Sequence, residues 1–113
     1  MMGSKIPVRT GARWPLWIAA ALLLAGAGCA SDTYYNRAYS AIADAEFEIE
    51  AAEEVRADLY AQPQLELALR SIEAARVAVQ NDKPNEATRL AERSEVEAQL
   101  AEALTMKARA EDY

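Results

Sequence analysis

Apolar residues recur at alternating steps of three and four positions from about residue 32 onward, which is the spacing of one face of an α-helix. The first series consists of Tyr35, Ala38, Ile42, Ala45, Ile49, Ala52 and Leu59. Arg56 interrupts this series, with Val55 beside it as a substitute. The spacing predicts a first helix over about 32–60 with one apolar seam.

Two further series follow, and each begins at a proline, a residue suited to the first turn of a helix. The second series, within about 63–81, consists of Leu65, Ala68, Leu69, Ile72, Ala75 and Val79. The third series, within about 84–111, consists of Ala87, Leu90, Ala91, Ser94, Ala98, Ala101, Thr105 and Ala108, widened by Val96, Leu100, Ala103 and Leu104. No stretch alternates with the period of two that strands show. The pattern predicts an all-α fold of three antiparallel helices in an elongated bundle or hairpin.

Alanine fills much of these seams, which lets the helix axes approach closely but buries little apolar area at each contact. At about 25 cal/mol per Å² of buried apolar surface, such a core stabilises the fold less than a leucine core would. A small domain of this kind is marginal on its own, so self-association or a partner helix is expected.

The start of the chain has a different pattern. Lys5, Arg9 and Arg13 give the first fourteen residues three positive charges and no acid, and residues 16–27 form an uncharged apolar run of twelve. A helix of that length covers about 18 Å, well short of the roughly 30 Å hydrocarbon core of a bilayer. We therefore expect residues 1–28 to be a signal peptide rather than a transmembrane span. No later segment is long and apolar enough to span a bilayer.

Cys29 is the single cysteine of the chain, and it directly follows the small residues Ala25-Gly26-Ala27-Gly28. This is the layout of a bacterial lipoprotein precursor, which predicts cleavage between Gly28 and Cys29. The thiol would receive a diacylglycerol and the new amino group an acyl chain such as palmitate, with no other cofactor expected. Residues 29–34 would then be a lipidated N-terminus with a short tether, ahead of a helical domain over 35–113.

A second processing route stays open. The position three before Cys29 is Gly26, where such precursors usually carry an aliphatic residue, and Ala25-Gly26-Ala27 also fits ordinary signal peptidase. That route yields a soluble exported protein without lipid. Ala30, rather than an aspartate, follows the cysteine. The predicted location is therefore the periplasmic face of the outer membrane, with the inner membrane or the periplasm as alternatives.

Three tyrosines, Tyr34, Tyr35 and Tyr39, lie within ten residues of Cys29. Amphipathic aromatic side chains are favoured at membrane interfaces, so these residues could contact the bilayer surface. The alternative is that Tyr35 and Tyr39 close one end of the helical bundle. The sequence favours the second interpretation.

After cleavage before Cys29 the chain would have 85 residues, all 18 acids and nine bases, a formal net charge of −9. A chain with this balance is poorly suited to bind nucleic acid or anionic lipid surfaces, so no nucleic-acid partner is expected. The densest charge feature is the set Glu46, Glu50, Glu53, Glu54 and Asp58, a candidate docking face for a basic partner. The sequence favours the alternative, a solvated and partly salt-bridged face, because an antiparallel hairpin brings Glu46 near Arg76 and Glu53 near Arg70.

Catalysis and metal binding find no support in the residues. The chain contains no histidine, the commonest general base, and its one cysteine is assigned to lipidation. The serines lack a glycine-flanked turn, and no calcium-loop spacing is present. We expect no enzyme activity, no metal site and no small-molecule substrate.

The helical region resembles a known family in four places. These are Tyr60-Ala61-Gln62-Pro63-Gln64-Leu65, the alternating Ala and Leu of 65–79, Asn81-Asp82-Lys83-Pro84, and Glu86-Ala87-Thr88-Arg89-Leu90-Ala91. Over about 36–110 the chain is similar to the DUF4398 family, an uncharacterised family of small Gram-negative lipoproteins whose helical domain also occurs ahead of OmpA-like peptidoglycan-binding domains. This chain departs from the family in having Gln62 before the proline and no OmpA-like domain. The resemblance implies a helical fold and an envelope location, and it lends no catalytic residues.

These observations predict an outer-membrane lipoprotein whose helical domain is a non-catalytic binding, scaffold or assembly accessory module for an envelope protein. One alternative is a self-associating coiled-coil spacer of the cell envelope, in which the partner is another copy. The other is the soluble exported helical protein without lipid.

Overall fold

A computed structural model describes residues 32–112 of the 113-residue chain. The predicted signal peptide over 1–28 and the lipidation residue Cys29 lie outside the described residues. Residues 34–112 belong to one compact unit. Within residues 32–112, no helix is long and apolar enough to cross a membrane.

The described part of the chain is helical and contains no strand, which confirms the predicted all-α class. Residues 32–54 form the first helix of this part. It is followed by the short α2 (Ala57–Tyr60), by α3 (Gln62–Gln80) and by α4 (Pro84–Glu111). Pro63 and Pro84 stand in the first turns of α3 and α4, as their sequence positions predicted.

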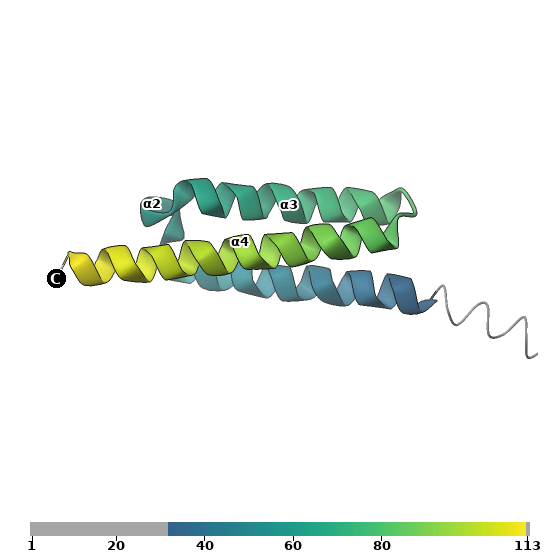
Figure 1. Cartoon of the computed structure of the whole chain (residues 1–113), viewed down its shortest axis with the longest axis horizontal. Helices are drawn as coiled ribbons and strands as arrows, with labels where there is room; N and C mark the ends of the chain where they lie inside the picture. Colours follow the sequence, from purple (N-terminus) through teal and green to yellow (C-terminus); the bar gives the residue numbers. More distant parts are fainter. Residues whose placement is uncertain (1–31, 113) are drawn as a thin grey trace, which may run out of the picture. The chain divides into compact units, whose positions relative to one another are not determined.

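The three long helices pack side by side in an up-down-up order (Figure 1). Ala38, Ala78 and Ala87 are buried in one cluster, so the early part of the first helix lies beside the end of α3 and the start of α4. The first helix and α4 therefore run in the same direction, and α3 runs against both.

The core is built mainly from alanine, as the seams predicted. Its larger side chains come from the first helix and α3, and these are Ile42, Ile49, Leu65 and Ile72. From α4 the same cluster receives Ala91, Ala98 and Ala101, each fully buried. Two hydroxyl residues of α4, Ser94 and Thr105, are also fully buried.

The α3–α4 turn ends α3 with a Schellman motif, in which a residue in the left-handed conformation follows the helix. Asp82 takes that conformation with φ 58°. The amide of Asp82 donates to the carbonyl of Val79 at 3.1 Å, and the amide of Lys83 donates to that of Ala78 at 2.9 Å. Aspartate tolerates this region better than most residues do, which explains how the turn forms without glycine.

The prediction of one continuous helix over 32–60 is wrong at its end. The helix stops at residue 54, and Arg56 takes the left-handed conformation with φ 72° and ψ 43° before α2 begins. This break rotates the following residues, so that Ala57 and Ala61 are buried while Leu59 is 65% exposed. Arg56, which interrupts the apolar seam in the sequence, therefore marks the end of the helix.

The predicted widening of the α4 stripe is also wrong at several positions. Val96 is 63% exposed and Leu100 is 49% exposed, and Ala103 is exposed as well. In α3, Leu69 is 41% exposed. The small residues of the seams let the helices pack closely, so little room remains between them for larger side chains. The larger side chains therefore lie beside the seams, at the edges of the helix interfaces or on the surface.

Candidate functional site

The candidate docking face predicted from sequence consists of Glu46, Glu50, Glu53, Glu54 and Asp58, here called the acidic surface. The first four lie on the first helix, within one third of its circumference, and Asp58 lies in α2. The first helix has seven acidic residues and one basic residue over 32–54, so it is the main source of negative charge in the described chain.

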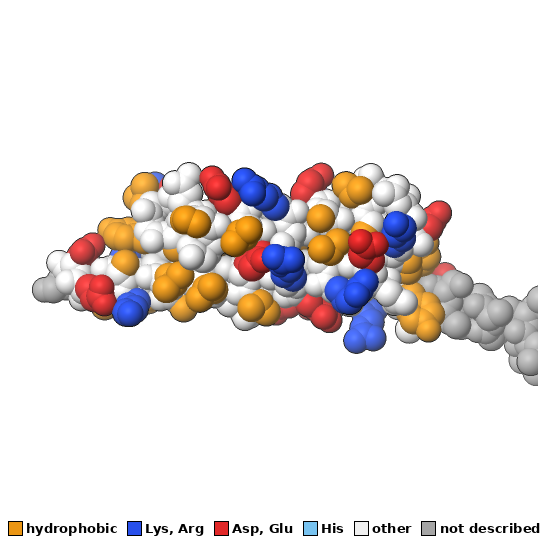
Figure 2. Space-filling model, turned by 45° about the horizontal axis from the view of Figure 1, so that its top comes forward, with side chains coloured by type: hydrophobic (Ala, Val, Ile, Leu, Met, Phe, Trp, Pro, Cys, Tyr) orange, Lys and Arg blue, Asp and Glu red, His pale blue; other side chains and the backbone are white. Residues whose placement is uncertain are grey.

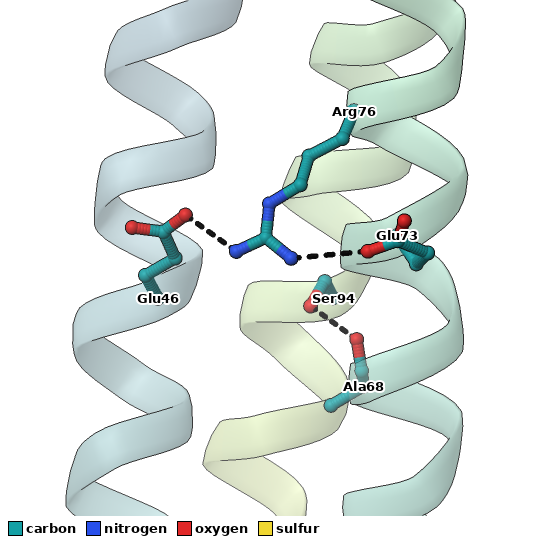
Figure 3. A network of polar contacts seen from close by, with 5 residues as sticks. All are labelled: Glu46, Ala68, Glu73, Arg76 and Ser94. Atoms are coloured by element: carbon teal, nitrogen blue, oxygen red, sulfur yellow. Dashed lines mark hydrogen bonds and ion pairs between the residues drawn. The ribbon is translucent and has the colours of Figure 1, made fainter.

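Glu46 is neutralised by a neighbouring helix, as the hairpin geometry predicted. Arg76 of α3 donates to Glu46 at 2.7 Å and to Glu73 at 3.2 Å (Figure 3). The hydrogen bond to Glu46 is the largest cause of a raised pKa at Arg76. Both side chains of the Glu46 pair are more than two fifths exposed, so the pair is expected to contribute no more than about 1 kcal/mol.

The second predicted pair, Glu53 with Arg70, does not form within the described residues, so this prediction is wrong. Glu53 instead lines an open groove between the end of the first helix and the start of α3, with a volume of ≈ 510 Å³. The other residues that line this groove are Arg56, Asp58, Gln62, Leu65, Glu66 and Leu69. Arg70 lies on a different groove, between α3 and α4.

Asp58 is held by the arginine that breaks the first helix. Arg56 donates from Nε to Oδ1 at 3.1 Å and from Nη2 to Oδ2 at 3.0 Å. This bidentate contact lowers the pKa of Asp58 and raises that of Arg56. Asp58 is therefore part of a local ion pair and is a poor candidate for capturing a basic partner.

Glu50, Glu53 and Glu54 form no ion pair within residues 32–112, so they remain the uncompensated acids of the acidic surface. Phe47, one turn before Glu50, is 69% exposed. Residues three and four apart are neighbours on a helix surface, so Phe47, Glu50 and Glu54 share one patch. Sequence reasoning missed Phe47, although its position outside the apolar seam was the available signal. The arrangement offers an aromatic contact bordered by negative charge.

Two polar contacts tie α4 to α3. Ser94 donates to the carbonyl of Ala68 at 2.6 Å in the buried interface (Figure 3). Ser71 donates to Glu97 at 2.9 Å, and Glu97 also accepts from Arg93 at 2.9 Å. The side chains of Ser94, Ser71 and Glu97 are therefore engaged in contacts within the bundle. In the part of the chain that is described, no group of three or more His, Cys, Asp or Glu residues is placed to hold a metal ion.

Comparison with known proteins gives one match. The family model described as "Domain of unknown function (DUF4398)" matches residues 40–113. No curated protein and no solved structure matches this chain. The match covers all of α2, α3 and α4 and most of the first helix, so it includes every residue of the acidic surface.

Proposed function

The chain belongs to the DUF4398 family of domains of unknown function, and from that premise we propose that it is a lipid-anchored protein of the outer membrane, facing the periplasm. Its helical domain acts as a non-catalytic docking or scaffold module there. The observation that carries the anchor is Cys29, the single cysteine of the chain, behind a cationic start and an uncharged apolar run. The observation that supports a docking role is the exposed Phe47 beside Glu50 and Glu54.

The anchor is tested by replacing Cys29 with serine. The wild-type chain is expected to fractionate with the outer membrane and to begin at an acylated Cys29, while Cys29→Ser loses the acyl mass and the membrane association. Membrane fractionation and mass spectrometry of the N-terminal peptide provide the measurement. A wild-type N-terminus without acyl mass, starting near Gly28, would instead establish the soluble exported protein.

The docking role is tested at the patch formed by Phe47, Glu50 and Glu54. A photo-crosslinking amino acid at position 47 is expected to join one envelope protein that presents basic residues. Reversing the charge with Glu50→Lys and Glu54→Lys should abolish that adduct, since these two acids lack a partner among the described residues. Glu111→Lys, on the exposed end of α4, is the matched control and should leave the adduct unchanged. Equal loss in the control would contradict the docking role.

Self-association as an envelope spacer is the second candidate, and exposed apolar side chains on α4 favour it. Val96 and Leu100 lie one turn apart and are 63% and 49% exposed. Figure 2 shows orange hydrophobic side chains spread over the face formed by α3 and α4, between charged ones. Light scattering on the purified chain distinguishes the candidates, since a stable oligomer that Val96→Glu dissociates would favour the spacer and a monomer would favour docking.

A further inference from the structure

Two arginines from different helices meet at the end of the bundle where α3 turns into α4. Arg37 of the first helix and Arg89 of α4 line one groove together with Asn85, Thr88 and Glu92. At ≈ 190 Å³ this groove is smaller than the roughly 300–1,000 Å³ of pockets that hold drug-sized ligands. Its size suits a small group such as a phosphate.

Neither arginine has a partner within residues 32–112, although this part of the chain has 18 acidic residues and only nine basic ones. Most of the other described arginines are engaged. Arg56, Arg76 and Arg93 form ion pairs, and Arg109 donates to a backbone carbonyl. Glu92 stands three positions after Arg89 and lines the same groove, yet it pairs with neither arginine. Two cations thus line one groove, and its single carboxylate, Glu92, forms an ion pair with neither of them.

From this juxtaposition we infer that Arg37 and Arg89 form a binding site for a phosphate group. Guanidinium groups bind phosphate oxygens by two parallel hydrogen bonds, and they do so more strongly than neutral donors. The amide of Asn85 supplies a further donor, since no described side chain engages it. Thr88 is 7% exposed and donates its hydroxyl to the carbonyl of Pro84 at 3.0 Å, so it forms part of the floor of the groove.

The phosphate could belong to a lipid headgroup or be free in solution, and both sources present the same chemistry. Arg37 is only eight residues after Cys29 in the sequence. Tyr34, three positions before Arg37 and so beside it on the helix surface, is 49% exposed. Tyrosines are enriched where proteins meet lipid headgroups. The headgroup source rests on the proposed anchor at Cys29, whereas the phosphate site does not. Figure 2 shows blue Lys and Arg side chains close together at the lower edge of this end.

The first experiment titrates the processed chain, held in phosphate-free maltoside micelles, with inorganic phosphate at constant ionic strength. The side-chain Nε–H signals of Arg37 and Arg89 should shift and saturate. Arg37→Gln and Arg89→Gln should each weaken binding about tenfold, the loss expected for a charge-assisted hydrogen bond. Glu92→Gln should tighten binding, because it removes the one negative charge from the groove.

Arg70→Gln is the matched control, because Arg70 is an exposed arginine of α3 that also lacks an ion pair among the described residues. It should leave phosphate binding unchanged. If Arg70→Gln weakens phosphate binding as much as Arg89→Gln does, the proposed site is wrong, and binding depends only on the overall positive charge. Thermal melting of each variant distinguishes a lost ligand contact from a lost fold.

The second experiment identifies the source by adding phosphatidylglycerol to the micelles, with an equal amount of diacylglycerol as the phosphate-free comparison. A shift with phosphatidylglycerol alone assigns the site to a headgroup, and a shift with inorganic phosphate alone assigns it to a soluble anion. No saturable shift with either probe overturns the inference. The mass of the N-terminal peptide reports the anchor separately, so failure of the site and failure of the anchor are distinguishable.

Discussion

Two hydroxyl groups buried in α4 differ in whether they have a partner. Ser94 and Thr105 are both fully buried. The hydroxyl of Ser94 donates to the carbonyl of Ala68, whereas Thr105 Oγ1 has no hydrogen-bond partner. A buried polar group without a partner costs about 1–3 kcal/mol of folding free energy, so Thr105 weakens the packing of α4 in the bundle. The same residue class therefore stabilises one site and destabilises another.

Replacing Thr105 with valine should raise the free energy of unfolding by about 1 kcal/mol, because valine keeps the branched shape and removes the unpaired hydroxyl. Ser94→Ala should lower it by about 1 kcal/mol, since the carbonyl of Ala68 then loses its side-chain donor. Chemical denaturation of the two variants and the wild type gives the comparison. A fall in stability for Thr105→Val would mean that this hydroxyl has a partner in solution.

Tyr35 and Asp82 link the first helix to the α3–α4 turn, and this link predicts a pH dependence. The hydroxyl of Tyr35 donates to Asp82 at 3.0 Å, and this hydrogen bond is the main cause of a pKa above the ordinary 10.0. The protonated tyrosine therefore adds stability that is complete below pH 10.0 and is lost as the pH rises through the folded-state pKa. Asp82→Asn should return the titration of Tyr35 toward the ordinary value.

Asparagine is a suitable replacement because it also tolerates the left-handed conformation that Asp82 adopts. Ultraviolet difference titration of the chain against its Tyr35→Phe variant isolates the signal of this one tyrosine. The prediction fails if Tyr35 titrates at the same pH with and without the Asp82 carboxylate.

At the scale of helices, the seam of small residues controls how closely α4 approaches its neighbours. Ala98 is fully buried, whereas Val96, two positions earlier on the same helix, is 63% exposed. Ala98→Leu should overpack the core and lower stability by about 1–3 kcal/mol. Val96→Leu, the control, should change stability by no more than about 0.5 kcal/mol. Thermal unfolding of both variants tests this, and a more stable Ala98→Leu would show that the stripe is not buried.

The positions of the helices follow from local signals in the sequence. Pro63 and Pro84 mark two helix starts, and the steps of three and four residues identify Ala38, Ala68 and Ala98 as buried. The break at Arg56 could not be located from periodicity alone, because it places an arginine in the unfavourable left-handed conformation. The burial of Ala57 and Ala61 helps to offset that cost. Tertiary packing outweighs the local preference at that point.

The candidate site was less predictable than the fold. The pairing of Glu46 with Arg76 followed from hairpin geometry, since the register of two antiparallel helices fixes which residues face each other. That register failed for Glu53 because the chain leaves the helix two residues later. The convergence of Arg37 and Arg89 depends on how the first helix meets α4, helices separated by the whole of α3. No spacing within one helix reports such a contact.

For the molecule as a whole, charge is unevenly distributed. The first helix carries seven acids against one base, whereas α3 has two of each. Four ion pairs between described residues neutralise part of this charge, and all four are at least partly exposed. Exposed ion pairs contribute little to the free energy of unfolding. Repulsion among the unpaired acids should therefore outweigh the attraction within the ion pairs. The structure therefore predicts that salt stabilises the fold.

Raising sodium chloride from about 0.01 M to about 1 M shortens the Debye length from about 30 Å to about 3 Å and screens the unpaired acids. The melting temperature should rise by roughly 5 °C, the shift that about 1 kcal/mol produces in a domain of this size. A variant with Glu50→Gln and Glu54→Gln should melt higher at low salt and show a smaller rise, because it lacks two of the repelling charges. If salt instead lowers the melting temperature, the ion pairs dominate, and the first helix has no surplus of negative charge to offer a basic partner.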